Sequence, residues 1–159
     1  FEVIVIGGGP DLEIMGAGGD ARLPALQTLD TGKVRIKSQT PRAETLELIA
    51  SSRALVFPSE WQEPFGLSII EAMALSKPVI ASRVAGPKDI VEDGVTGFLF
   101  QPGDVDELAD CMKRLQDNPD LAVELGRAGR ARYEKEYSPD AGYARMLENY
   151  RRLGLSIPS

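Results

Sequence analysis

The sequence predicts an α/β fold in which a doubly wound parallel sheet carries helices on both faces. Two observations predict it. Short apolar segments of strand length alternate along the chain with longer segments of helical periodicity, which is the pattern of repeated strand–helix units. The chain has 159 residues, of which 43% are hydrophobic and 26% charged. This size and composition suit a single soluble globular domain over residues 1–159.

Two strands are expected near the start of the chain. Residues 2–6 form a short apolar run that ends in glycines, and residues 12–16 form another. Parallel neighbours need a crossover of about a dozen residues or more, and only a few residues separate these two. Either the strands form an unusual hairpin or a segment near residues 7–11 is missing from the sequence. We favour the missing segment.

The next signals are those of a helix, a strand, a second helix and a second strand. Asp20 can cap a helix that runs to about residue 29, with Pro24 in its first turn. An alternating strand, an amphipathic helix and a buried strand are then expected at residues 34–37, 41–49 and 54–57.

The second half of the chain continues the alternation. After an apolar helix near residues 67–75, Pro78 precedes a strand at residues 79–82. A short helix at about residues 88–92 and a turn then lead to a strand at residues 97–100.

Three helices are expected at the end of the chain. Asp104, with Glu107 three residues later, is a capping box that opens the first of them, and an Asn-Pro pair stops it. A charged helix follows at residues 120–136, and the last helix is expected at about residues 139–152. In an open parallel sheet, ligands bind beyond the carboxyl ends of the strands.

The most informative stretch is residues 63–75, EPFGLSIIEAMAL, a loop that runs into a short helix with apolar residues on nearly every side. Glu71 lies in the middle of this helix and Glu63 just before it. A buried carboxylate without a partner is destabilising by several kcal/mol, so each needs a partner from the protein or a ligand. At a helical rise of about 1.5 Å per residue, the two lie roughly 12 Å apart. That is about the length of the middle of a nucleotide sugar.

A diphosphate would then lie over the start of the helix. The backbone N–H groups of Phe65, Gly66 and Leu67 are free to point at it. The positive end of the helix dipole favours its charge, and Gly66 allows a close approach. One carboxylate could reach the ribose and the other the sugar.

These residues resemble a known family. Glu63 and Glu71 form an E-x7-E pair within EPFGL…EAMA, followed by KPVIAS and then AGPKDIVEDGVTG. The run closely resembles the donor-binding domain of retaining glycosyltransferases of the GT-B fold, of the family 4 or group 1 type. These enzymes use UDP-, GDP- or ADP-sugars. The resemblance covers roughly residues 11–152.

The resemblance implies a Rossmann-like domain that is one half of a GT-B enzyme. Such an enzyme transfers a hexose-type sugar from a nucleotide diphosphate to an acceptor, with no resident cofactor and no essential metal. Glu63 would be the catalytic residue that contacts hydroxyls of the transferred sugar, and Glu71 would hold the ribose. The backbones of Phe65, Gly66 and Leu67 would bind sugar and diphosphate. The acceptor-binding first domain is absent from this chain, which alone is expected to be inactive.

The nucleotide base is expected to contact a loop in the first part of the chain. Ungapped counting back from Glu63 places Gln39 and Thr40 in the loop that has this role in the family. A plain loop without ligand contacts is the alternative.

Two departures from the family pattern weaken the expected site. The family carries an Arg and a Lys after the first strand of this domain, where they clamp the diphosphate with charge-assisted hydrogen bonds. Residues 7–10 are Gly-Gly-Gly-Pro and include neither. Ala85 also stands at the first position of a loop that often reads Gly-Gly in the family.

Three alternatives compete with the donor-site interpretation. Residues 16–21 match the G-x-G-x-x-A fingerprint of NAD-binding modules, but no acidic residue ends the next strand to hold the ribose. The chain could also be a non-catalytic interaction domain that kept this fold. Finally, Glu71 could be a core acid paired with Arg83 or Lys88, with Glu63 an exposed loop acid.

Composition excludes several other functions. The net charge is −6 and the pI is near 4.8, so the chain lacks the excess of positive charge typical of nucleic-acid-binding proteins. The chain has no histidine, which excludes Ser-His and Cys-His nucleophile pairs, and one cysteine, Cys111, which excludes an internal disulfide. No apolar run approaches the length of a transmembrane helix. We expect a cytoplasmic location.

Overall fold

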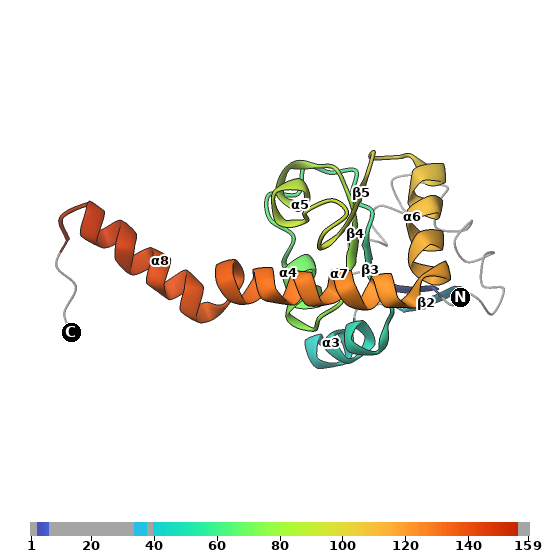
Figure 1. Cartoon of the computed structure of the whole chain (residues 1–159), viewed down its shortest axis with the longest axis horizontal. Coiled ribbons are helices and arrows are strands. Elements are labelled where there is room, and N and C mark those ends of the chain that lie inside the picture. The colour runs from blue at the N-terminus through green and yellow to red at the C-terminus, as the bar shows by residue number, and fades with distance from the viewer. Residues whose placement is uncertain (1–2, 7–33, 38–39, 156–159) are drawn as a thin grey trace, which may run out of the picture. The chain divides into compact units, whose positions relative to one another are not determined.

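The computed structural model describes residues 3–6, 34–37 and 40–155 (Figure 1). The chain divides into two compact units, Phe1–Leu48 and Ile49–Ser159. The strand expected at residues 12–16, the helix expected at 20–29 and the segment near 7–11 all lie outside the described residues.

The first unit contains a pair of parallel strands. β1 (Val3–Ile6) lies beside β2 (Val34–Lys37), with Val3 opposite Val34. Both strands were expected from their apolar patterns. The helix α3 (Arg42–Ser51) follows, and the boundary between the two units falls within it, after Leu48.

The second unit is built on a three-stranded parallel sheet. Its strands are β3 (Leu55–Phe57), β4 (Val79–Ser82) and β5 (Gly97–Phe100), in the order β3-β4-β5. The central strand β4 is buried along its whole length, as a strand covered on both faces must be. The parallel α/β architecture predicted from the sequence is therefore confirmed.

Helices cover both faces of this sheet. α4 (Leu67–Ala74) follows β3, and α5 (Ala85–Ile90) follows β4. The helices of the C-terminal part are α6 (Val105–Asp117), α7 (Pro119–Arg132), the π-helical segment Tyr133–Tyr137 and α8 (Pro139–Arg152). No residue of α8 is buried, and in Figure 1 it leads away from the sheet of this unit.

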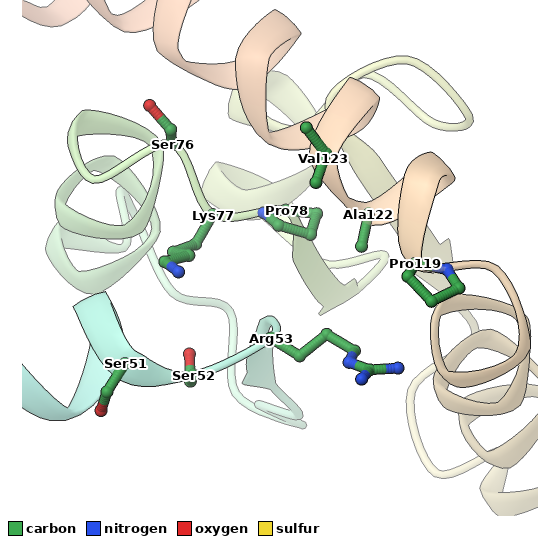
Figure 2. A pocket seen from close by; sticks show the side chains of 9 residues that line it. All are labelled: Ser51, Ser52, Arg53, Ser76, Lys77, Pro78, Pro119, Ala122 and Val123. Carbon is green, nitrogen blue, oxygen red and sulfur yellow. The ribbon is translucent and has the colours of Figure 1, made fainter.

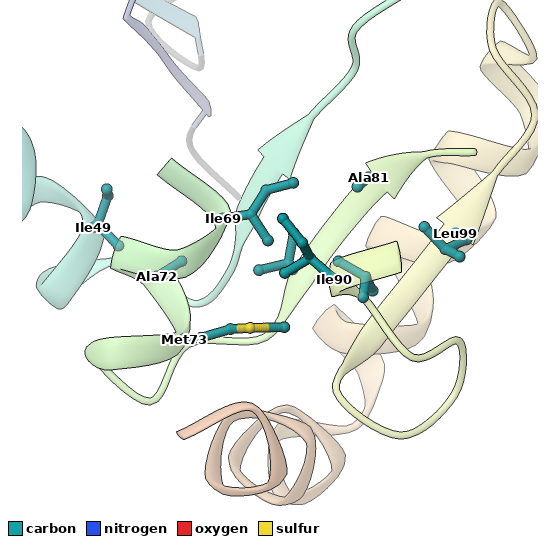
Figure 3. Packing of buried hydrophobic residues seen from close by; sticks show 9 residues of the cluster. Ile49, Ile69, Ala72, Met73, Ala81, Ile90 and Leu99 are labelled. Atoms are coloured by element: carbon teal, nitrogen blue, oxygen red, sulfur yellow. The ribbon is translucent and has the colours of Figure 1, made fainter. Parts of the chain in front are cut away.

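Two apolar clusters lie on opposite faces of the sheet because successive strand side chains alternate between faces. Figure 3 shows the first, in which Ile69 and Met73 of α4 and Ile90 of α5 pack with Ala81 and Leu99 of the sheet.

The second cluster holds the neighbouring strand positions. Ile80 and Phe98 pack there with Cys111 and Leu115 of α6 and Leu125 of α7. Because helices pack on both of its faces, the sheet has a fixed position, and so does the edge at which its strands end.

Three local features differ from the sequence prediction. α5 begins at Ala85 and ends at Ile90, earlier than the expected 88–92, because a proline such as Pro87 is tolerated in the first turn of a helix. The Asp104 side chain accepts a hydrogen bond from the Glu107 N–H at 2.9 Å, as a capping box requires. The Glu107 carboxylate, however, accepts from the Gln101 N–H at 2.6 Å rather than from the cap residue. The charged helix expected at 120–136 changes to π-helical geometry at Tyr133.

Within the part of the chain that the structure describes, no helix is long and apolar enough to cross a membrane. The same residues contain no group of three or more His, Cys, Asp or Glu side chains arranged to hold a metal ion.

Cys111 gives a testable prediction about the second cluster. Burial, with the Glu107 carboxylate acting in the same direction, raises the pKa of the Cys111 thiol. Because the folded state holds the proton more tightly, this thiol contributes stability below the usual thiol pKa of about 8.5 and loses it as the pH rises through the folded value. At pH 8, DTNB should label native Cys111 slowly and unfolded protein at once. Fast stoichiometric labelling of the folded protein would contradict this packing.

Candidate functional site

Two loops meet at the edge where β3 and β4 end. The Ser82 side chain, at the end of β4, is fully buried, and its Oγ lies 2.5 Å from the Ser59 carbonyl and 3.3 Å from the Phe57 carbonyl. The Gly86 N–H donates to the Glu63 carbonyl at 2.8 Å. These bonds tie the loop that follows β3 to the turn that follows β4.

The two loops are in backbone contact at Gly86. A Cβ atom on this glycine would lie 2.5 Å from the Phe65 nitrogen and 2.6 Å from the carbonyl carbon and oxygen of Pro64. Real Cβ contacts below about 3.0 Å are essentially never seen, so the loop reaches this position only because residue 86 has no side chain. Positions 85 and 86 often read Gly-Gly in the family. In this chain, the second glycine, Gly86, is retained, and it is the one that makes the contact.

The N-terminus of α4 lies in the loop that Gly86 holds. Gly66 is its N-cap, with φ at 84° in the left-handed region that favours glycine, and no side chain caps the helix. Among the described residues, none accepts a hydrogen bond from the N–H groups of Phe65, Gly66 or Leu67. These unpaired amide donors, at the positive end of a helix dipole, can serve an anion that reaches them.

The two predicted carboxylates flank these amides along the chain. Glu63 is half-buried before the helix, and Glu71 is half-buried in the middle of α4. The buried side of α4 is formed by Ile69, Ala72 and Met73. The structure therefore places all five residues predicted for the sugar, diphosphate and ribose on one loop–helix segment.

Arg83, one of two cations considered as partners of Glu71, forms an ion pair with Asp93 at 2.9 Å. The other, Lys88, is exposed on α5.

The base-binding prediction concerns the first unit. Gln39 lies outside the described residues. Thr40 is half-buried, and its hydroxyl lies 2.8 Å from the hydroxyl of Thr45 in α3. A role for either residue in contacting the base stays a prediction.

The loop also contacts the segment that leads into α8. The rings of Phe65 and Tyr137 meet edge to face, with centroids 6.3 Å apart and an interplanar angle of 69°. Tyr137 ends the π-helical segment, and single turns of π-helix occur often at functional sites.

Sequence reasoning missed two residues that shape this site, Ser82 and the retained Gly86. A serine at the end of an otherwise apolar buried strand was the available signal for Ser82, because a buried hydroxyl needs hydrogen-bond partners. The backbone contact at Gly86 joins residues about twenty positions apart, and no local pattern reports it.

A pocket of about 320 Å³ lies elsewhere in the second unit (Figure 2). Arg53 and Lys77, which line it, precede β3 and β4, so the pocket is at the opposite end of the strands. The Arg53 guanidinium donates to the carbonyls of Leu115 and Gln116 at the end of α6. Arg53 therefore holds the end of α6 in this pocket. The candidate site is the one at the edge of the sheet where the carboxyl ends of the strands lie.

Known proteins are similar to this chain in sequence and in architecture. The family model described as "Glycosyl transferases group 1" matches residues 3–132. The alpha-maltose-1-phosphate synthase of Mycolicibacterium smegmatis is 30% identical over 158 residues, which are 96% of this chain and 41% of that protein.

Solved structures show the same fold. The sucrose-phosphate synthase from Thermosynechococcus elongatus superimposes with a TM-score of 0.78 at 30% identity, over 96% of this chain and 38% of that one. Anabaena HepE in complex with UDP-glucose superimposes with a TM-score of 0.75 at 24% identity, over 95% of this chain and 41% of that one. The chain thus spans about two fifths of these proteins, and it matches one half of the GT-B architecture.

Proposed function

The chain belongs to the group 1 family of glycosyl transferases, and we propose that it holds the nucleotide-sugar donor of a retaining hexosyltransferase. The observation that carries the proposal is the uncapped start of α4, where free amides lie between Glu63 and Glu71 along the chain. A diphosphate needs such donors, and the sugars on either side of it need acceptors for their hydroxyls.

Each residue then has a distinct role. The N–H groups of Phe65, Gly66 and Leu67 donate to the diphosphate. Glu71, farther along α4, accepts from the ribose hydroxyls, and Glu63, before the helix, accepts from hydroxyls of the transferred sugar. The two carboxylates fix the donor at both ends, and the amides fix its centre.

The same arrangement suits the transfer reaction. As the bond between the anomeric carbon and the phosphate oxygen breaks, negative charge develops on the departing diphosphate. Amide donors and a helix dipole aimed at that charge stabilise it more than they stabilise the intact donor. The acceptor hydroxyl oxygen then forms its bond to the anomeric carbon on the face of the sugar that the diphosphate left, and its proton passes to the departing phosphate oxygen. The acceptor itself requires protein beyond this chain.

A thermal-shift panel tests the proposal. The chain is heated with UDP, GDP, ADP, UDP-glucose, GDP-mannose or NAD at about 100 times the dissociation constant, where a bound ligand stabilises by about 2.7 kcal/mol. One nucleotide family should raise the Tm by several degrees, and Glu71→Gln should remove that shift because an amide accepts ribose hydroxyl bonds less well than a carboxylate.

The matched control is Glu124→Gln, the same change at an exposed position on α7. It should leave the shift intact. Stabilisation by NAD alone, persisting in Glu71→Gln, would contradict the donor site and favour a dinucleotide-binding module. The absence of any shift in a folded chain would contradict it too, and would favour an interaction domain.

A further inference from the structure

Trp61 is the only tryptophan of the chain, and 75% of its surface is exposed. Tryptophan is normally among the more buried residues, because its ring removes some 150–250 Å² of surface from water when it packs. Trp61 belongs to neither apolar cluster of the described residues. Its ring therefore contributes little to the core.

The backbone that carries this ring is nevertheless fixed. The Trp61 N–H donates to the Ser59 hydroxyl at 3.2 Å, and the Trp61 carbonyl accepts from the Glu63 N–H at 2.7 Å. Ser59 is in turn tied to the buried Ser82 at the end of β4. An exposed tryptophan on a tethered loop is held ready for a ligand at lower entropic cost than one on a free loop.

Trp61 lies in the same turn as Glu63, the residue proposed to bind the transferred sugar. A pyranose has a rim of hydroxyl groups and a face of C–H groups. A carboxylate such as Glu63 serves the rim, and an aromatic face serves the C–H groups. Trp61 and Glu63, joined by a backbone hydrogen bond, together offer both kinds of contact.

We propose that Trp61 is a stacking platform for a pyranose ring at the sugar end of this site, an inference that rests on the proposed function. The ring belongs either to the transferred sugar of the donor or to a sugar acceptor that binds beside it. In both cases the indole determines sugar affinity, while the amides and Glu71 determine nucleotide affinity.

The single tryptophan allows a direct test on the whole chain. The fluorescence emission of Trp61 is followed while UDP, GDP and ADP are added, and then while UDP-glucose, GDP-mannose and ADP-glucose are added. Methyl α-D-glucoside and maltose are added separately to the nucleotide-bound chain. Thermal shifts of the same samples, with and without Glu71→Gln, report nucleotide binding independently.

The proposal expects emission to change with a sugar and not with the bare nucleotide. A change with the nucleotide sugar assigns the ring to the donor, and a change only with the free glycosides assigns it to the acceptor. If a nucleotide stabilises the chain in a Glu71-dependent way but no sugar alters the emission, the proposal that Trp61 stacks on a sugar is wrong. The proposal of a donor site is then unaffected. If the bare nucleotide alone changes the emission fully, the sugar assignment is wrong. If no nucleotide stabilises the chain, both proposals fall.

Affinity measurements on variants give a second readout. Trp61→Ala should weaken binding of the responding sugar ligand about tenfold and leave binding of the bare nucleotide unchanged, and Trp61→Phe should restore part of the loss. The control is Leu153→Ala, which removes a side chain of similar exposure (73%) at the end of α8. Equal losses for nucleotide and sugar ligand in Trp61→Ala would overturn the proposal.

Discussion

Replacing Gly86 by alanine should weaken nucleotide binding at least tenfold. The new Cβ would lie 2.5 Å from the Phe65 nitrogen and 2.6 Å from the Pro64 carbonyl group. All of these are backbone atoms, so no side chain can turn aside, and the loop or α5 must move by most of an ångström. A displacement of about 1 Å in a positioned group can reduce activity about a hundredfold. The move also strains the hydrogen bond from Gly86 to Glu63.

Calorimetric titration of the stabilising nucleotide into Gly86→Ala measures this effect, and urea unfolding measures the accompanying loss of stability, about 1–3 kcal/mol for an overpacked contact. Gly142→Ala is the matched control, because a Cβ there meets no atom within 4 Å. Unchanged affinity in Gly86→Ala would show that the loop and the α5 turn need not touch for the nucleotide to bind.

Replacing Gly126 by alanine should give a large loss of stability, about 3 kcal/mol or roughly 10 °C in Tm. This glycine lies in α7 where the helix packs on the turn between α4 and β4, and its Cβ would stand 2.1 Å from the Ser76 carbonyl oxygen. Ser76 has a positive φ of 58°, a conformation that residues other than glycine adopt rarely. The backbone at Ser76 therefore cannot easily move away from the Cβ atom added at residue 126.

The same substitution at Gly142 tests whether sterics or helix propensity decides the outcome. Both glycines lie within helices, but the one in α8 is open to solvent. Alanine there should be neutral or stabilising by up to about 1 kcal/mol. Chemical unfolding of the two variants compares them directly, and equal effects at the two positions would contradict the close packing of α7 on the Ser76 turn.

Local patterns in the sequence were enough to predict most of the described fold. The strands at 79–82 and 97–100 and the last helix at 139–152 were located from apolar periodicity and caps, and the structure confirms them. The start of α5 was placed too late, because Ala85-Gly86-Pro87 resembles a loop and not a helical turn. The π-helical segment after Arg132 was also missed, since its side-chain pattern continues that of the helix before it.

The residues proposed for the site were named from one stretch of the chain, and their roles stay predictions; the contacts between this stretch and other loops were not foreseen. Glu63, Gly66 and Glu71 follow from one motif, and the structure places them on one loop and helix. The contact of Gly86 with Pro64 and the buried bond from Ser82 to Ser59 join different strand ends. Such contacts depend on how strands pair, which a single sequence does not encode in any local pattern.

In the donor site that we propose, a diphosphate lies on the unpaired amides at the start of α4. The measurement that tests it most directly is the NMR spectrum of the chain labelled with ¹⁵N-glycine, titrated with the nucleotide that stabilises it. Gly86→Ala and Gly142→Ala assign two signals, and matching variants assign the others.

We expect the Gly66 signal to move most and the Gly86 signal to move with it. The signals of Gly126 and Gly142, which lie on α7 and α8, should stay in place. A stationary Gly66 signal with moving signals from Gly16, Gly18 and Gly19 would contradict binding at α4 and place the nucleotide at the dinucleotide fingerprint instead.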